Sequence, residues 1–204
     1  MSIVRFIVYF LCTFSLFLLF SCSEEHSLEE LERIKSIGDE NPKKALSMLD
    51  SLKIGIREES DYVKNKYDLL QIRLNDKADN IPSSDIMIKN LIGYFEEKGS
   101  MLDKQEVYYY AGSVYRDLQD TPRSLEYFLK SIEYAMNENN CDSIMIRNAY
   151  SNLNDLYYKV QNYNDAVKMA QKELEITKQI RGNTTLPYLH IGTAFLAQNN
   201  QRQA

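Results

Sequence analysis

From Leu28 onward, apolar residues return every three or four positions, the spacing that places them on one face of an α-helix. Leu28, Leu31, Ile34 and Ile37 form the first such stripe. Comparable stripes fill the segments that follow, and no stretch after the first 22 residues shows the strict alternation expected of a β-strand. The pattern therefore predicts an all-α protein.

Breaks in the pattern divide these helices into pairs. Asn41-Pro42 and Thr121-Pro122 read as an N-cap followed by proline at the first helical position, and Gly182-Asn183 reads as a helix end. The predicted pairs cover residues 28–55, 60–99, 105–137 and 147–181, followed by half a pair over 185–204.

Three stretches carry the same spaced marks, most of them small or aromatic residues. The first two have marks at offsets 0, 3, 4, 7, 16 and 20, and the third has the first five of these. In the first stretch the marks are Tyr108, Ala111, Gly112, Tyr115, Ser124 and Phe128. The second stretch, 42 residues later, has Tyr150, Leu153, Asn154, Tyr157, Ala166 and Ala170. The third, after 38 more, has Tyr188, Ile191, Gly192, Phe195 and Ala204. Small residues at these intervals suit paired helices whose backbones approach closely.

These marks resemble the tetratricopeptide repeat (TPR), whose period is about 34 residues. The resemblance implies a TPR-type α-solenoid of antiparallel helix pairs over residues 28–204. It also implies a scaffold that binds a protein or peptide and catalyses nothing. The partner is not identified by the sequence.

The first 21 residues predict a signal peptide. Arg5 is the only charge before Glu24, and the apolar run from Phe6 to Phe20 is shorter than the roughly 20 residues of a membrane span. Its end, Leu19-Phe20-Ser21-Cys22, resembles a bacterial lipobox, which implies a lipid such as palmitate on Cys22. Residues 22–27 would then form a lipidated polar tether. A plain signal peptide or an uncleaved anchor is the alternative.

The lipobox, the Asp39-to-Ala45 segment and the residues from Ile81 onward together resemble TPR lipoproteins of Bacteroides-type bacteria. The resemblance implies an exported protein anchored by lipid on the periplasmic side or at the cell surface of a Gram-negative bacterium. Inner membrane, outer membrane and surface exposure all remain open. Longer members resemble sensors or regulators, so the chain is expected to be either a short paralogue or the truncated sensing portion of such a protein.

Charge and cysteine content exclude some partners. Without Arg5 the chain has 23 basic and 29 acidic residues, a net charge of −6, and no basic block that would bind nucleic-acid phosphates. Removal of the signal peptide and acylation of Cys22 would leave Cys141 as the one free cysteine, so no internal disulfide is expected.

The sequence predicts neither catalysis nor a cofactor. His26 and His190 are the only histidines, and neither has a cysteine or carboxylate at the spacing of a metal site. The seven glycines are scattered rather than gathered into a phosphate-binding loop. We therefore expect no catalytic residue and no metal site.

By resemblance to TPR stacks, first-helix residues that face away from the paired helix line a groove for a partner. The predicted groove residues are Tyr109, Tyr110, Ser113, Arg116, Asn148, Asn152, Asp155 and Tyr158. Leu189, His190 and Thr193 are the corresponding residues of the half repeat. The tyrosines and asparagines suit an extended peptide, because they combine apolar area with hydrogen-bonding groups. Basic residues are missing where a clamp for a terminal carboxylate would need them.

Two other interpretations of these residues stay open. The first is that they are ordinary surface residues of a structural spacer. The second is glycan capture, in which Tyr109, Tyr110 and Tyr158 would stack on a sugar, although the chain has no tryptophan.

The half repeat leads to a further expectation. Helix 186–198 should pack one face on helix 165–180 and leave other large apolar side chains uncovered. Such an uncovered stripe predicts a fragment, or self-association through the C-terminal end.

Overall fold

A computed structural model describes residues 24–136 and 141–203, and every regular element in these two ranges is an α-helix. The fold class predicted from the periodicity is thereby confirmed. The predicted signal peptide and the proposed lipidation site at Cys22 lie outside the described residues.

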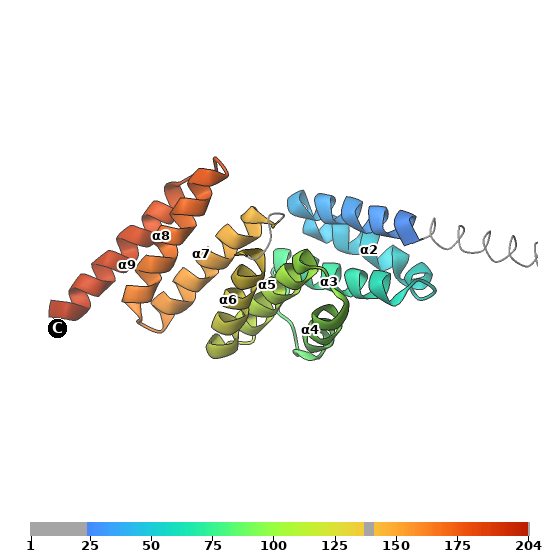
Figure 1. Cartoon of the computed structure of the whole chain (residues 1–204), viewed down its shortest axis with the longest axis horizontal. Coiled ribbons are helices and arrows are strands. Elements are labelled where there is room, and N and C mark those ends of the chain that lie inside the picture. Colours follow the sequence, from blue (N-terminus) through green and yellow to red (C-terminus); the bar gives the residue numbers. More distant parts are fainter. Residues whose placement is uncertain (1–23, 137–140, 204) are drawn as a thin grey trace, which may run out of the picture. The chain divides into compact units, whose positions relative to one another are not determined.

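Residues 24–40 are helical, and eight labelled helices follow (Figure 1). They are α2 (Pro42–Ile56), α3 (Asp61–Lys77), α4 (Ile86–Lys98), α5 (Met101–Asp117), α6 (Thr121–Met136), α7 (Ser143–Lys159), α8 (Tyr163–Gln179) and α9 (Thr185–Gln203).

The chain divides into two compact units, Met1–Asn80 and Ile81–Ala204. In the first unit α3 packs on α2, and in the second α4 packs on α5. The sequence had grouped the segment 60–99 as one helix pair, whereas each of its two helices has its main partner elsewhere along the chain. The spacing of apolar residues could not predict this pairing, because an apolar helix face does not indicate which neighbouring helix covers it.

The first unit is held by an apolar core shared by the helix over residues 24–40, α2 and α3. Ile34, Leu49 and Leu74 are almost completely buried in it. Asn41 begins α2 as predicted, because its Oδ1 accepts a hydrogen bond from the main-chain nitrogen of Lys44 at 3.0 Å and proline follows it.

The predicted polar tether is partly helical in the structure. Residues 24–27, which the sequence analysis assigned to the tether, belong to the helix over residues 24–40. Ser27 Oγ donates to Glu59 Oε1 at 2.7 Å, and Ser60 Oγ donates to Glu24 Oε1 at 2.9 Å. These bonds join the start of the helix to the turn before α3.

The second unit is a succession of antiparallel helices in two layers. α5, α7 and α9 contact one another in order, and α6 and α8 pack between successive members of that layer. In Figure 1, α7, α8 and α9 lie side by side at the red end of the chain. The layer of first helices has one side covered by α6 and α8, and we call its opposite side the α5–α7–α9 face.

The α5–α6 contact shows why a small residue recurs in the pattern. Ser124 Oγ donates to the main-chain carbonyl of Gly112 at 2.8 Å, and Phe128 is completely buried over the same glycine. A Cβ on Gly112 would come within 2.6 Å of the Phe128 ring. The two backbones can approach this closely only because the position has no side chain.

Several helices of the second unit end on a residue with left-handed backbone. Gln119, Gln161 and Arg181 have φ values of 61°, 61° and 54°, and each follows a helix by two positions. The sequence analysis placed the end of α8 at Gly182, the residue type that tolerates positive φ. That expectation was wrong by one position, because Arg181 takes the left-handed conformation and the Gly182 nitrogen donates to the carbonyl of Thr177 at 2.8 Å.

A ladder of tyrosines lies between α5 and α6, where Tyr127 stacks on Tyr115 with ring centroids 5.3 Å apart. Tyr115, which is completely buried, donates from its hydroxyl to Asp85 Oδ2 at 2.9 Å. Burial and then this hydrogen bond raise the pKa of Tyr115 to about 12. The hydrogen bond between Tyr115 and Asp85 therefore depends on a neutral Tyr115 hydroxyl group.

Candidate functional site

The α5–α7–α9 face begins where α7 is joined to α5. Asp142 caps α7 by accepting a hydrogen bond from the Met145 nitrogen at 2.9 Å. The buried Gln105 of α5 makes two bonds to the Asp142 main chain, one from Nε2 to the carbonyl at 2.9 Å and one from the nitrogen to Oε1 at 3.0 Å. A single side-chain amide thus sets the position of the α7 start against α5.

A chain of hydrogen bonds crosses this face from α5 to α7. Arg116 Nη1 donates to Asn152 Oδ1 at 2.7 Å, and Asn152 Nδ2 donates to the main-chain carbonyl of Asn148 at 2.9 Å. Arg147 Nη2 donates to Asn148 Oδ1 at 2.7 Å. All four residues are half-buried, so the face presents ordered amide and guanidinium groups at its surface.

A second polar cluster ties α9 to α7 and α8. His190 Nδ1 lies 2.8 Å from Glu173 Oε2, and its Nε2 lies 3.8 Å from Asp155 Oδ1. Glu173 is 2% exposed, which makes the imidazole its essential partner. The Asp155 side chain is 70% exposed, so it meets the imidazole at the outer edge of this cluster. The cluster positions α9 against its two neighbouring helices.

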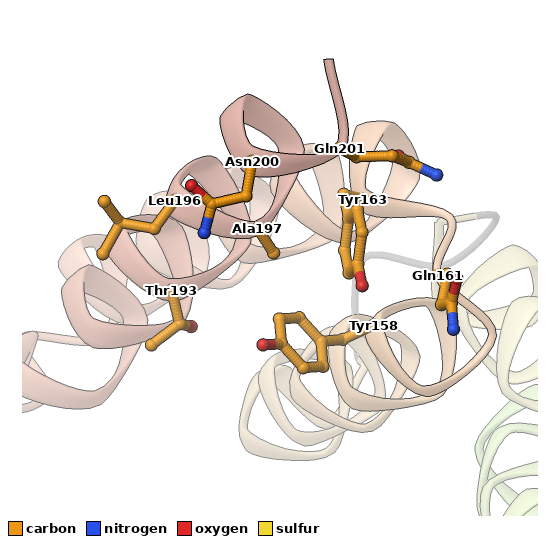
Figure 2. A pocket seen from close by; sticks show the side chains of 8 residues that line it. All are labelled: Tyr158, Gln161, Tyr163, Thr193, Leu196, Ala197, Asn200 and Gln201. Atoms are coloured by element: carbon orange, nitrogen blue, oxygen red, sulfur yellow. The ribbon is translucent and has the colours of Figure 1, made fainter. Parts of the chain in front are cut away.

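The face ends in an open pocket between α7, the start of α8 and α9, with a volume of about 530 Å³ (Figure 2). The pocket is lined by Tyr158, Gln161, Tyr163, Thr193, Leu196, Ala197, Asn200 and Gln201. None of these carries a charge. The rings of Tyr158 and Tyr163 pack edge to face with centroids 5.3 Å apart, and Thr193 and Leu196 lie across from them on α9. The pocket suits an uncharged group that has both apolar surface and hydrogen-bonding atoms.

The eight predicted groove residues separate into two groups. Arg116, Asn148, Asn152, Asp155 and Tyr158 are at least partly accessible, and they lie along the face just described.

The other three predicted groove residues are buried, with exposures of 8% for Tyr109, 3% for Tyr110 and 1% for Ser113. Tyr109 packs edge to face on Phe128, with centroids 5.5 Å apart, and on Tyr110 at 5.1 Å. Their helical register agrees with the groove pattern, but they lie beneath the protein surface in this structure. The glycan interpretation keeps only Tyr158 of its three tyrosines on an accessible surface.

Other contributors to the face were not predicted. Tyr163 and Gln161 lie at the turn between the paired helices, and Glu173 lies inside the second helix. The sequence reasoning considered only first-helix faces, so it had no signal for residues that reach the site from α8. Of the three half-repeat residues, Thr193 lines the pocket, Leu189 is exposed, and His190 is tied to Glu173.

Among the described residues, no three His, Cys, Asp or Glu side chains gather as metal ligands would. In the same part of the chain, every helix is too short or too polar to cross a membrane.

Comparisons with known proteins agree with this fold. Residues 103–179 match the family model of the tetratricopeptide repeat. The structure resembles the crystal structure of BtubC (BKLC) from P. vanneervenii with a TM-score of 0.65 and 13% identity, covering 91% of this chain and 86% of that chain. At this identity the likeness concerns the fold. No curated protein matches the sequence.

The chain thus has an all-α fold of the TPR-solenoid type, and the part of it that matches the TPR family model is residues 103–179. TPR domains generally mediate protein interactions and are typically non-catalytic scaffolds.

Proposed function

We propose that the protein is a non-catalytic scaffold whose α5–α7–α9 face binds an extended segment of a partner protein. The observation that supports this most directly is the hydrogen-bonded chain of Arg116, Asn152 and Asn148. It holds polar groups from successive first helices in place before any partner arrives, which lowers the entropic cost of binding.

The same bonds leave some hydrogen-bonding capacity for a peptide. The Asn148 side-chain oxygen accepts from Arg147, while its Nδ2 donates to no other described residue. An amide of this kind can donate to a main-chain carbonyl of a bound peptide. The uncharged pocket beside Tyr158 would accept a neutral side chain of that peptide.

A panel of displayed random peptides panned against the full-length protein tests the proposal. We expect selected peptides to lose at least about tenfold in affinity for Asn152→Ala and for Tyr158→Ala, which is about 1.4 kcal/mol. Asn90→Ala is the matched control for Asn152→Ala, because it removes an accessible side chain of the same type from α4, away from this face.

The outcomes separate the alternatives. Equal losses for the control and face variants would contradict the proposed location. If the pocket selects oligosaccharides from a glycan array and no peptide is enriched, glycan capture is favoured instead. If neither peptides nor oligosaccharides bind to the protein, the structural-spacer interpretation is favoured.

We further propose that the scaffold is exported and held at a bacterial membrane by lipid on Cys22. The support is the sequence of Arg5, the apolar run and Ser21-Cys22, which together resemble a lipoprotein signal. Intact mass of membrane-extracted protein should show loss of residues 1–21 and added acyl mass. Cys22→Ala should leave the precursor uncleaved and unlipidated. A mature mass without lipid would contradict the anchor.

A further inference from the structure

One side of α9 carries the repeat marks that another helix covers in the preceding repeats. Tyr188, Ile191, Gly192 and Phe195 correspond to Tyr108, Ala111, Gly112 and Tyr115 of α5. Tyr108, Ala111 and Tyr115 of α5 are at most 4% exposed. Gly112 is also buried, against α6. On α9, by contrast, Tyr188 is 54% exposed and Phe195 is 41% exposed.

Gly192 shows the difference most clearly. A Cβ on Gly112 would meet the Phe128 ring, but a Cβ on Gly192 would meet no described atom within 4 Å. We call the surface of Tyr188, Ile191, Gly192, Phe195 and Asn199 the outer α9 face. It lies on a different side of the helix from the pocket, which is lined by Thr193, Leu196 and Asn200.

The α5–α6 contact defines what such a face receives. The two helices are antiparallel, because Gln105 is bonded to Ser131 while Gly112 is bonded to Ser124. Within this contact the ring of Phe128 lies against Gly112. The unit of recognition is therefore an aromatic ring from one helix on the glycine of an antiparallel partner.

The outer α9 face holds both halves of this unit, with Gly192 as the glycine and Phe195 as the ring. We propose that a second copy of the chain covers it, through an antiparallel contact of the two α9 helices about a two-fold axis between positions 193 and 194. In that arrangement Gly192 of each copy receives Phe195 of the other, and Tyr188 lies opposite Asn199. A two-fold interface requires this kind of self-complementarity.

Charge favours a second copy here over other surfaces of the molecule. The chain has a net charge of −5, so two copies repel one another in general. Between Thr185 and Gln201 there is no Asp, Glu, Lys or Arg, so the two faces meet without opposed like charges. Lys178 of α8 lies at the edge, with its Nζ 5.8 Å from the centre of the Tyr188 ring.

The test is sedimentation equilibrium of the full-length chain in a density-matched detergent. We expect a reversible monomer–dimer equilibrium for the wild type and monomers for Gly192→Glu. The two new carboxylates would lie only about 4.5 Å apart along the helix axis, from the helical rise per residue. Gly93→Glu is the matched control, because Gly93 is also an exposed helical glycine with open space at its Cβ. It should dimerise like the wild type.

A charge swap makes the test independent of any general effect of the substitution. Gly192→Lys alone should also be monomeric, whereas an equal mixture of the Gly192→Glu and Gly192→Lys chains should recover the dimer. Circular dichroism should show the same helical content throughout.

Three results would overturn the proposal. The first is a wild-type protein that stays monomeric at all concentrations. This holds even if an added amphipathic helix binds to the outer α9 face, because the occupant would then not be a second copy. Another is unchanged association of Gly192→Glu. The third is loss of the dimer in Tyr158→Ala, which would move the interface to the pocket.

Discussion

The side-chain amide of Asn154 on α7 donates a hydrogen bond to the main-chain carbonyl of Ala166 on α8 at 2.9 Å. In the preceding pair, Ser124 of α6 donates to the carbonyl of Gly112 of α5 at 2.8 Å. Asn154 and Gly112 occupy the same repeat position, as do Ala166 and Ser124. The two pairs thus keep one helix-to-helix hydrogen bond but supply its donor from opposite helices.

This exchange predicts a rescue. Asn154→Ala should lower the free energy of unfolding by about 1–2 kcal/mol, because a buried amide and its bond are lost. Adding Ala166→Ser to that variant should recover part of the loss by restoring the donor from the second helix, as in the preceding pair. Urea unfolding followed by circular dichroism measures both. A double variant less stable than the single one would show that the hydroxyl cannot take over the bond.

The two glycines at equivalent positions should respond oppositely to the same change. Gly112→Ala should destabilise the protein by about 1–3 kcal/mol, because its Cβ would overlap the buried Phe128 ring. In the dilute monomer, Gly192→Ala should stabilise the protein by about 0.5–1 kcal/mol, because the site is open there and alanine favours a helix. In the proposed dimer the new Cβ would instead meet Phe195 of the other copy. Thermal melting of the two variants side by side is the comparison. Equal destabilisation at concentrations where the protein is monomeric would mean that Gly192 is not open in solution.

The left-handed residue after α5 offers a stabilising substitution. Gln119 has a φ of 61°, which costs energy for a residue with a Cβ and none for glycine. Gln119→Gly should therefore raise the free energy of unfolding by about 0.5–1 kcal/mol. Glu126→Gly on the exposed side of α6 is the control and should lower it by about 1 kcal/mol. If both variants lose stability alike, the backbone at 119 is not left-handed in solution.

The tyrosine ladder predicts a loss of stability in alkali. The pKa of Tyr115 is raised to about 12 in the folded chain, against about 10 when unfolded. The folded state therefore holds its proton more tightly, so the contribution is complete below pH 10 and falls as the pH rises toward 12. In Tyr115→Phe, the melting temperature should fall less steeply between pH 10 and pH 12 than in the wild type. The slope that remains would come from the other tyrosines. An identical alkaline slope in wild type and variant would contradict the assignment.

The spacing of apolar residues by itself determined that the chain is helical and where its repeats lie. This information is local, because residues three or four apart share a helix face whatever covers it. Asn41-Pro42 likewise marked the start of α2, since capping needs only the next few residues. The offsets of Gly112 and Phe128 also indicated a close helix contact that the structure contains.

Tertiary structure decided which helical faces are covered and which remain open. Tyr109, Tyr110 and Ser113 have the register of a groove but are buried, whereas Asn152 and Tyr158 have the same register and stay accessible. Tyr163 joins the pocket from the next helix, a proximity that no spacing within α7 encodes. Burial depends on contacts with residues that are distant in the sequence. Local sequence patterns can therefore identify candidate surface residues, but tertiary packing decides which of them are exposed.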